Sequence, residues 1–155
     1  MATNDYVFVT LWRVAGNVDR VYRVLVDIEN YPRWWPEVYL QVEPLTPLKK
    51  TIGDRVRLLT RGKLPYKIRW QSEIVQANPP HGFMTRATGD FDGRGIWSLK
   101  QQGSDVVLTF DWRLRVQKRL IRNLSWLFKP LFRWNHRRAM ARGREGLSRE
   151  MMSAR

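Results

Sequence analysis

The chain has 155 residues, of which 43% are hydrophobic and 27% charged; this composition favours a folded protein with a buried core and argues against intrinsic disorder. It contains no cysteine, which excludes disulfides, thiolate nucleophiles and cysteine-ligated metals. The net charge is +14, and residues 113–155 hold 13 Lys or Arg against only Glu145 and Glu150. Such a basic end favours an anionic partner, namely acidic lipid, nucleic acid or an anionic ligand, with a solvated helical face as the alternative.

The start of the chain, residues 1–5, has neither a basic run nor an apolar run, so no signal peptide is expected. No stretch reaches the roughly 18 uncharged apolar residues of a membrane-spanning helix. We therefore expect a single domain over residues 1–155. Its expected location is the cytoplasm, with peripheral contact at a membrane surface left open.

The first elements are predicted from two different periodicities. Residues 5–13 alternate between polar and apolar side chains, which predicts a strand. Asn17 is a favourable N-cap, and apolar residues then recur at helical spacing, which predicts a helix over residues 18–29. In residues 31–36 two prolines stand four positions apart, so a short and broken helical turn is expected there.

Sheet-like segments follow one another through the middle of the chain. The clearest is Tyr66–Ile74, where odd positions are polar and even positions are apolar except for Ser72. A period of two gives a strand one wet and one dry face. Residues that favour turns separate the segments, so that six further strands are predicted at 37–43, 54–61, 65–77, 82–91, 94–101 and 105–116.

The chain from about residue 118 is predicted to be helical. Apolar residues recur one, three and four positions apart from Leu120 to Phe132. Pro130 interrupts this stripe and is expected to kink or restart the helix. Small residues at 139, 143 and 146 would let the helix lie close to the sheet, and a large one-sided sheet needs such a cover for its dry face.

Three segments resemble one known superfamily. They are Asp27–Val38 (DIENYPRWWPEV), Thr88–Trp97 (TGDFDGRGIW), and Trp134-Asn135-His136 with Met140, Gly143 and Gly146-Leu147. Together with the order of the predicted elements, they resemble the START-like (SRPBCC) superfamily, and most closely its polyketide cyclase/dehydrase-like branch. The similarity extends over nearly the whole chain.

The resemblance implies an α+β helix-grip fold. In this fold a curved seven-stranded antiparallel sheet wraps around a long C-terminal helix, and two short helices follow the first strand. It also implies an apolar cavity between sheet and helix, which relatives use for lipids, quinones, polyketides or plant hormones. Some of these relatives are enzymes and many are carriers or sensors, so the fold does not decide the function.

Alternation along the strands predicts which side chains face that cavity. We expect ligand contacts from Trp35, Leu58, Tyr66, Ile68, Trp70, Phe83, Thr85, Trp97, Leu99, Phe110, Trp112, Leu127, Leu131 and Asn135. Leu40, Val56, Leu108 and Met140 complete the predicted inner surface. For each tryptophan, the alternative to stacking on a flat ligand is a place in the core. For Asn135 the alternative is a tie between helix and sheet.

The predicted inner surface is poor in groups that could transfer a proton. The charged residues of the strands, such as Lys67, Arg69 and Asp111, fall on the other face. His136 lies about 100° round the helix from Asn135, so we expect it at the cavity edge or in solvent. General acid–base catalysis needs a titratable group beside the substrate. We therefore predict no catalytic residue, no metal site and no cofactor, with Asn135, Tyr66 and Thr85 orienting the ligand.

The segment 118–129 is basic on one side and apolar on the other. This composition suits a helix that covers the cavity mouth, and it also suits a helix at an anionic membrane surface, where Lys118, Arg119, Arg122 and Lys129 would contact lipid headgroups. The leading hypothesis is thus a binding or transport protein for a hydrophobic or aromatic small molecule. The alternatives are a polyketide cyclase or aromatase using Tyr66 or His136, and membrane association. Nucleic acid is disfavoured because the tryptophans are predicted to face inward.

Overall fold

The computed structural model describes residues 5–61, 67–116 and 125–153, and in this part the side chains of Phe91 and of residues 125–129 are not included. Seven strands form one antiparallel sheet in the order β1-β7-β6-β5-β4-β3-β2. Their bounds are β1 Asp5–Ala15, β2 Tyr39–Pro44, β3 Arg55–Thr60, β4 Ile68–Asn78, β5 Gly82–Gly89, β6 Phe91–Gln102 and β7 Asp105–Val116. Every strand except β1 and β2 has a partner on both sides, so these two form the edges of the sheet.

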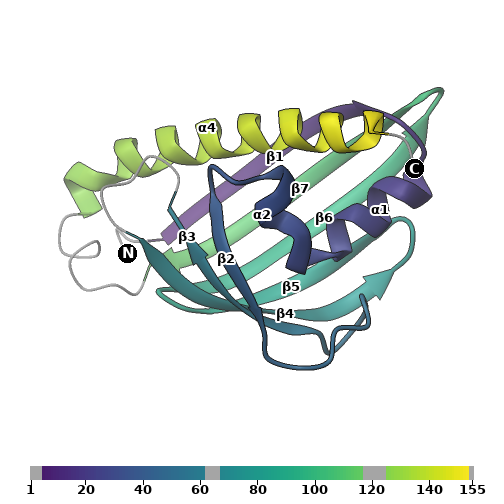
Figure 1. The fold of residues 1–155 in the computed structure, drawn as a ribbon. Helices are drawn as coiled ribbons and strands as arrows, with labels where there is room; N and C mark the ends of the chain where they lie inside the picture. Colours follow the sequence, from purple (N-terminus) through teal and green to yellow (C-terminus); the bar gives the residue numbers. More distant parts are fainter. Residues whose placement is uncertain (1–4, 62–66, 117–124, 154–155) are drawn as a thin grey trace.

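The helices are α1 Val18–Val26, the 3-10 turn η1 Ile28–Asn30, α2 Tyr31–Trp34 and α4 Ser125–Met152. Figure 1 shows a curved sheet with α4 lying lengthwise across it, α1 near the end where α4 finishes, and α2 between α1 and β2. This is the predicted α+β helix-grip fold, with a curved seven-stranded sheet, two short helices after the first strand and a long C-terminal helix. Within the described residues no helix is long and apolar enough to cross a membrane.

The first helix begins as predicted but ends earlier. The Asn17 side chain accepts hydrogen bonds from the backbone N–H groups of Asp19 and Arg20, at 2.9 and 3.4 Å. The helix stops at Val26 instead of residue 29, and a 3-10 turn follows. The Tyr31 hydroxyl donates to the carbonyl of Leu25, which folds the second short helix back against the first.

The helix α4 is held closely by α2 and β1 through its small residues. A Cβ atom added at Gly146 would lie 1.9 Å from the carbonyl oxygen of Trp34, and one added at Gly143 would lie 2.5 Å from the Trp35 ring and 2.9 Å from the Trp12 ring. The small residues therefore leave room for tryptophan rings and for the backbone of α2 to pack against α4, in addition to letting the helix lie near the sheet. Pro130 was expected to kink or restart the helix. One helix runs through it without a restart, because the missing N–H removes only one bond near the beginning of the helix.

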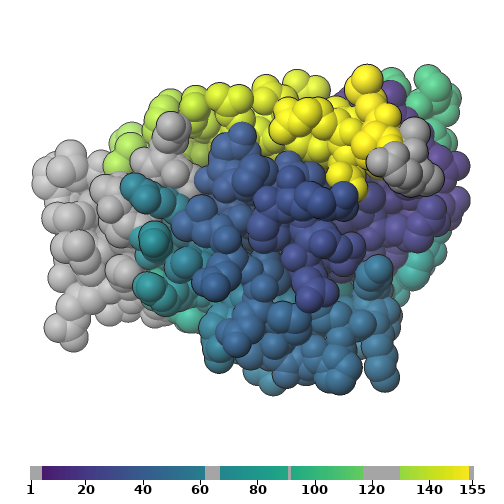
Figure 2. Space-filling view, viewed as in Figure 1, coloured from purple at the N-terminus to yellow at the C-terminus, as the bar shows by residue number. Residues whose placement is uncertain are grey.

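The buried apolar residues form two clusters. One lies under α1 and α2 and includes Trp12, Leu25 and Trp97; the other lies at the opposite end of the sheet and includes Tyr6 and Trp112. Partly buried residues such as Phe110 and Tyr39 pack against both clusters. Figure 2 shows that atoms of α2 and β2 directly adjoin those of α4, so this side of the space between the clusters is covered.

Candidate functional site

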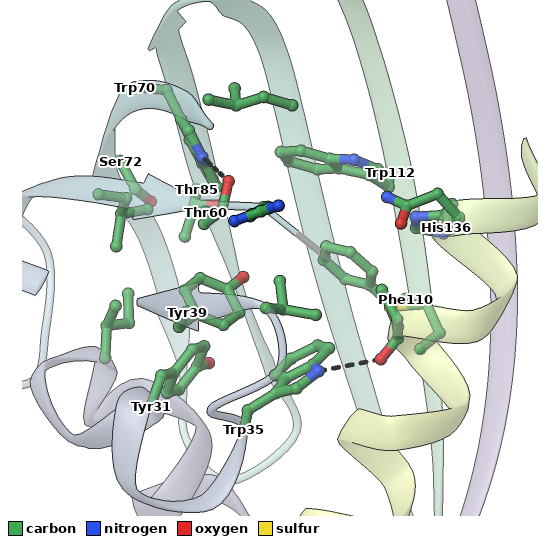
Figure 3. Close-up of a pocket in the computed structure, with 18 of the residues that line it drawn as sticks. Tyr31, Trp35, Tyr39, Thr60, Trp70, Ser72, Thr85, Phe110, Trp112 and His136 are labelled. Carbon is green, nitrogen blue, oxygen red and sulfur yellow. Dashed lines mark hydrogen bonds between the residues drawn. The ribbon is translucent and has the colours of Figure 1, made fainter. Parts of the chain in front are cut away.

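A cavity of about 110 Å³ lies between the two clusters, bordered by the sheet, the segment from η1 to β2, and α4, and it is partly open to solvent. Figure 3 shows its principal side chains converging from strands, short helices and α4. It is lined by Ile28, Tyr31, Trp35, Val38, Tyr39, Leu58, Thr60, Arg61, Ile68, Trp70, Ser72, Phe83, Thr85, Trp97, Phe110, Trp112, Phe132, Asn135, His136, Ala139 and Met140. An apolar cavity of about 150 Å³ can hold benzene, so this space is of the size of one aromatic ring.

Aromatic rings from strands β7, β6 and β4 form one wall. Phe110 of β7 stacks on Trp97 of β6 with ring centroids 4.3 Å apart, and on Trp112 with centroids 5.6 Å apart. Trp112 in turn meets Trp70 of β4 at 5.6 Å. The alternation of β7 places Phe110 and Trp112 two positions apart on the same face. The wall is therefore a continuous apolar and polarizable surface suited to a flat ligand.

The opposite wall comes from the segment between α1 and β2. The Trp35 indole N–H donates to the carbonyl of Ala139 at 2.9 Å, which joins α2 to α4 across the cavity. Tyr39 packs its ring against Trp35 and Tyr31, with centroids 5.1 and 5.0 Å away. Burial raises the pKa of Tyr39 well above its ordinary value, so its hydroxyl remains a proton donor at neutral pH.

Several polar groups of the lining are already engaged within the protein. The Trp70 indole N–H donates to the Thr60 hydroxyl at 3.0 Å, and the Thr85 hydroxyl contacts the carbonyl of Gly95 at 3.5 Å. Asn135 and Ser72 are buried, with exposed fractions of 9% and 5%. By contrast, the Tyr39 hydroxyl makes no hydrogen bond to any described residue and points toward the cavity space in Figure 3. Of the two tyrosines that line the cavity, Tyr39 is therefore the one whose hydroxyl is available to bond to a ligand.

His136 is the titratable group that the structure places beside the aromatic wall. Its ring stacks on Phe8 of β1 with centroids 4.0 Å apart, and Figure 3 shows it on α4 next to Trp112. Its Nε2 atom is buried without a hydrogen-bond partner among the described residues. Burial lowers the pKa of His136 to about 4, so the imidazole is neutral at physiological pH. It can thus accept or donate a hydrogen bond, according to its tautomer.

This burial predicts a specific loss of stability in acid. Between pH of about 6.5 and about 4 the unfolded chain protonates His136 while the folded protein does not. Stability should therefore fall as pH drops through this window, by up to about 3 kcal/mol from this residue. Replacing His136 by phenylalanine keeps a ring against Phe8 and removes the proton site. Urea unfolding at several pH values should show a shallower acid loss for His136→Phe than for the wild type.

The matched control is His81→Gln, because His81 is exposed in the turn between β4 and β5. Its pH profile should follow that of the wild type. Parallel acid losses in the wild type and in His136→Phe would contradict the prediction.

The cavity brings together most of the residues predicted from the sequence. Those of the predicted ligand contacts that line it are Trp35, Leu58, Ile68, Trp70, Phe83, Thr85, Trp97, Phe110, Trp112 and Asn135. Met140, predicted for the inner surface, lines it as well. Tyr66 and the basic residues Lys118, Arg119 and Arg122 lie outside the described residues, and the side chains of Leu127 and Lys129 are not described. The ligand contacts of Tyr66 and Leu127, and the membrane contacts of the four basic residues, remain predictions.

Three expectations about the inner surface are corrected. Leu131 is 40% exposed, and its neighbour Phe132 takes the inward position on α4. Leu40 is likewise 40% exposed, because a register shift between Tyr39 and Gln41 turns Tyr39 inward in its place. Leu99 is buried at 4% but lies in the cluster under α1, away from the cavity.

Val56 and Leu108 follow the same rule as Leu99: both are buried on the inner face, yet neither lines the cavity. Alternation predicts which face of the sheet a side chain lies on, but not which of the inward side chains along a strand lie beside the cavity. The error for His136 is the opposite one. It was expected at the cavity edge or in solvent, but it lines the cavity and its Nε2 atom is buried. The expectation of few titratable groups is corrected accordingly, as Arg61, Tyr31, Tyr39 and His136 all belong to the lining.

Comparisons with known proteins agree with this architecture. Residues 14–142 match the family described as "Polyketide cyclase / dehydrase and lipid transport". No curated protein sequence matches the chain. Among solved structures, the protein TTHA0849 from Thermus thermophilus superposes with a TM-score of 0.80 at 17% identity, covering 96% of this chain and 99% of that one.

Two further solved structures have informative names. The Zhui aromatase/cyclase from Streptomyces sp. R1128 superposes with a TM-score of 0.72 at 18% identity, covering 96% of this chain and 94% of that one. A START superfamily protein from Mycobacterium smegmatis gives 0.75 at 14% identity, covering 96% and 99%. At such identities the likeness concerns the fold alone.

Proposed function

The chain belongs to the polyketide cyclase/dehydrase and lipid transport family, and on this premise we propose that it binds a hydrophobic or aromatic small molecule in the cavity under α4. The family includes aromatase/cyclases, while its description also covers lipid transport, so membership leaves binding and catalysis both open. The observation that carries the proposal is the continuous aromatic wall of Trp97, Phe110 and Trp112 facing the cavity.

Burial of apolar surface would supply most of the affinity, at about 25 cal/mol per Å² removed from water. The volume favours a ligand, or a ligand segment, with one ring or a short chain; a lipid, quinone or polyketide-like molecule of larger size would need side chains of the lining to move. The neutral His136 ring and the Tyr39 hydroxyl would give the ligand its orientation, since both can hydrogen-bond without the cost of a buried charge.

Native mass spectrometry of gently purified protein tests the proposal directly. We expect a second species whose added mass disappears on denaturation, and the extracted molecule should be apolar or aromatic. Purified apo protein should also bind toluene and p-cresol in an NMR titration, with shifts that centre on the cavity-lining residues. The absence of a bound species together with no binding of either probe would overturn the proposal.

Catalysis is the second candidate function, and the placement of His136 favours it. A polyketide cyclase needs a group that moves a proton beside the substrate, and both His136 and Tyr39 line the cavity. A chemically synthesised poly-β-ketone mimic should then cyclise faster with the wild type than with His136→Phe, even at concentrations of the mimic that saturate both proteins. Equal rates in the two proteins and in buffer would leave binding as the function.

Peripheral membrane contact remains part of the proposal for a cytoplasmic protein. On the outer side of α4, Trp134 is 45% exposed and borders a groove with Arg138 and Arg142. An exposed tryptophan beside arginines suits the headgroup region of an acidic bilayer, where each cation adds about 1 kcal/mol. Co-sedimentation with vesicles that contain phosphatidylserine, but not with neutral vesicles, would support this contact. Equal sedimentation with both would contradict it.

A further inference from the structure

The edge strand β1 carries an exposed apolar row on the outer face of the sheet. Val7, Val9 and Leu11 are 61%, 65% and 68% exposed, whereas the side chains between them point toward α4. The row runs along a strand of 11 residues that has a neighbour, β7, on one side only. Long apolar edge strands invite the addition of another strand, and proteins usually protect them with charges, bulges or proline. The register between β1 and β7 shows no bulge.

The odd-numbered residues of β1 direct their backbone N–H and C=O groups toward the open edge of the sheet. The Gly16 N–H donates to the carbonyl of Ser104, and these two residues continue the register in which Ala15 lies opposite Asp105. Hydrogen-bonded and non-hydrogen-bonded pairs alternate along an antiparallel ladder. The even residues of β1 therefore bond to β7. Val7, Val9 and Leu11 direct their N–H and C=O groups to the open edge, on the same residues that expose apolar side chains.

The sequence of this edge is complementary to itself. If β1 pairs antiparallel with a second β1 about a two-fold axis at Val9, then Val7 lies opposite Leu11, and Asp5 lies opposite Arg13. Apolar residues thus meet apolar residues, and a negative end meets a positive end. Shifting the axis by one residue would place Arg13 opposite Val7, or Asp5 opposite Leu11. Only the register centred on Val9 satisfies charges and apolar side chains together.

The end charges can also join larger networks. Asp5 already pairs with Arg115 at 2.8 Å, and Arg13 pairs with Asp105 at 3.0 Å. The side chains of Asp5 and Arg13 keep exposed fractions of 48% and 56%, so both can accept a second partner. In the two-fold pairing, each end of the interface would show four charges of alternating sign. Networks of this kind contribute more than isolated surface pairs and fix the register.

We propose that β1 is a self-association surface, through which two copies of the chain join edge to edge into one continuous sheet with the axis at Val9. The contact is isologous, since the same residues serve both copies, and this closes the assembly at a dimer. It leaves the inner side of α4 and the cavity of each copy unchanged.

The register is tested by single cysteine variants, because the chain has no cysteine of its own. Directly opposed residues of a hydrogen-bonded pair have Cα atoms about 5.5 Å apart, within the range for a disulfide. Val9→Cys should therefore cross-link to itself under mild oxidation. Val7→Cys and Leu11→Cys should each remain without a cross-link when oxidised alone, since each introduced cysteine lies about 13 Å from its counterpart in the second copy. A mixture of these two variants should form the cross-linked heterodimer.

Sedimentation velocity gives an independent test of the unmodified chain. The wild type should sediment as a dimer at micromolar concentration, and Val9→Asp, which sets two carboxylates face to face on the axis, should sediment as a monomer. Ile52→Asp is the control, because Ile52 is 59% exposed but lies away from β1, and it should remain dimeric. Thermal melts must show both variants folded. A monomeric wild type, a dimer that Val9→Asp leaves intact, or cross-linking of Val7→Cys alone would overturn the proposal.

Discussion

Replacing Trp35 by alanine is expected to lower the free energy of unfolding by about 3–5 kcal/mol, the largest effect on stability of any substitution considered for this protein. Trp35 is only 3% exposed. Its ring meets Trp12, Trp34 and Tyr39 at centroid distances of 5.1 to 5.7 Å. Its indole N–H also holds the carbonyl of Ala139 on α4. The truncation thus removes buried surface, leaves a void beside an existing cavity, and cuts a link between two helices.

Equilibrium urea unfolding of the wild type, Trp35→Ala and Trp35→Phe separates these contributions. Trp35→Phe retains an aromatic ring and loses the N–H donor, so it should lie between the other two proteins. Trp134→Ala is the matched control, since this tryptophan is 45% exposed on α4 and its loss should cost within about 0.5 kcal/mol. A cost for Trp35→Ala no greater than that of the control would contradict the packing described above.

Filling the cavity should abolish binding while the protein remains folded. Ser72 is buried on β4 and lines the cavity, whose volume is close to that of one aromatic ring. In Ser72→Phe the new ring would occupy the space that the proposed ligand needs. The affinity for toluene and p-cresol should fall by at least about 100-fold, equivalent to about 2.7 kcal/mol. The added ring should also cost about 1–3 kcal/mol of stability, because it must displace some of the side chains that line the cavity.

NMR titration of both probes into wild type, Ser72→Phe and Thr88→Phe provides the measurement. Thr88 lies on the outer, exposed face of β5, so the same added volume there should leave binding unchanged. Undiminished binding to Ser72→Phe would show that the probes bind elsewhere. Loss of binding in both variants would point to a general disturbance of the sheet.

The strands and their inward faces could be predicted from the sequence because a period of two translates directly into a face. Ile68, Trp70 and Trp112 lie as the alternation requires, and each lines the cavity. Thr60 and Ser72 follow the same alternation and also line the cavity, although the predicted contacts did not include them. Periodicity therefore located the inner face better than hydrophobicity did.

The remaining residues of the site depend on features without a periodic signal. Tyr31 and Tyr39 come from an irregular segment with two prolines, and a register shift in β2 decides that Tyr39 faces inward. His136 was expected at the edge because adjacent helical residues point about 100° apart. A cavity that curves around the helix can nevertheless receive both Asn135 and His136. The rotation of α4 about its own axis decides whether Leu131 or Phe132 faces the cavity. The sequence around them is almost continuously apolar, so its pattern does not predict this rotation.

Several contacts of the described residues anchor α4 at its C-terminal half. Its C-terminal half is fixed by the Gly146 contact with Trp34, by the ion pair of Arg33 with Glu150 at 2.6 Å, and by hydrogen bonds from Arg20 to the carbonyls of Glu150 and Met151. Phe132, Asn135 and His136, which line the cavity, lie in the other half. Substitutions in the N-terminal half of α4 can therefore change ligand specificity during evolution, while the C-terminal half keeps the helix in place. The same division indicates where an engineer could begin to redesign specificity.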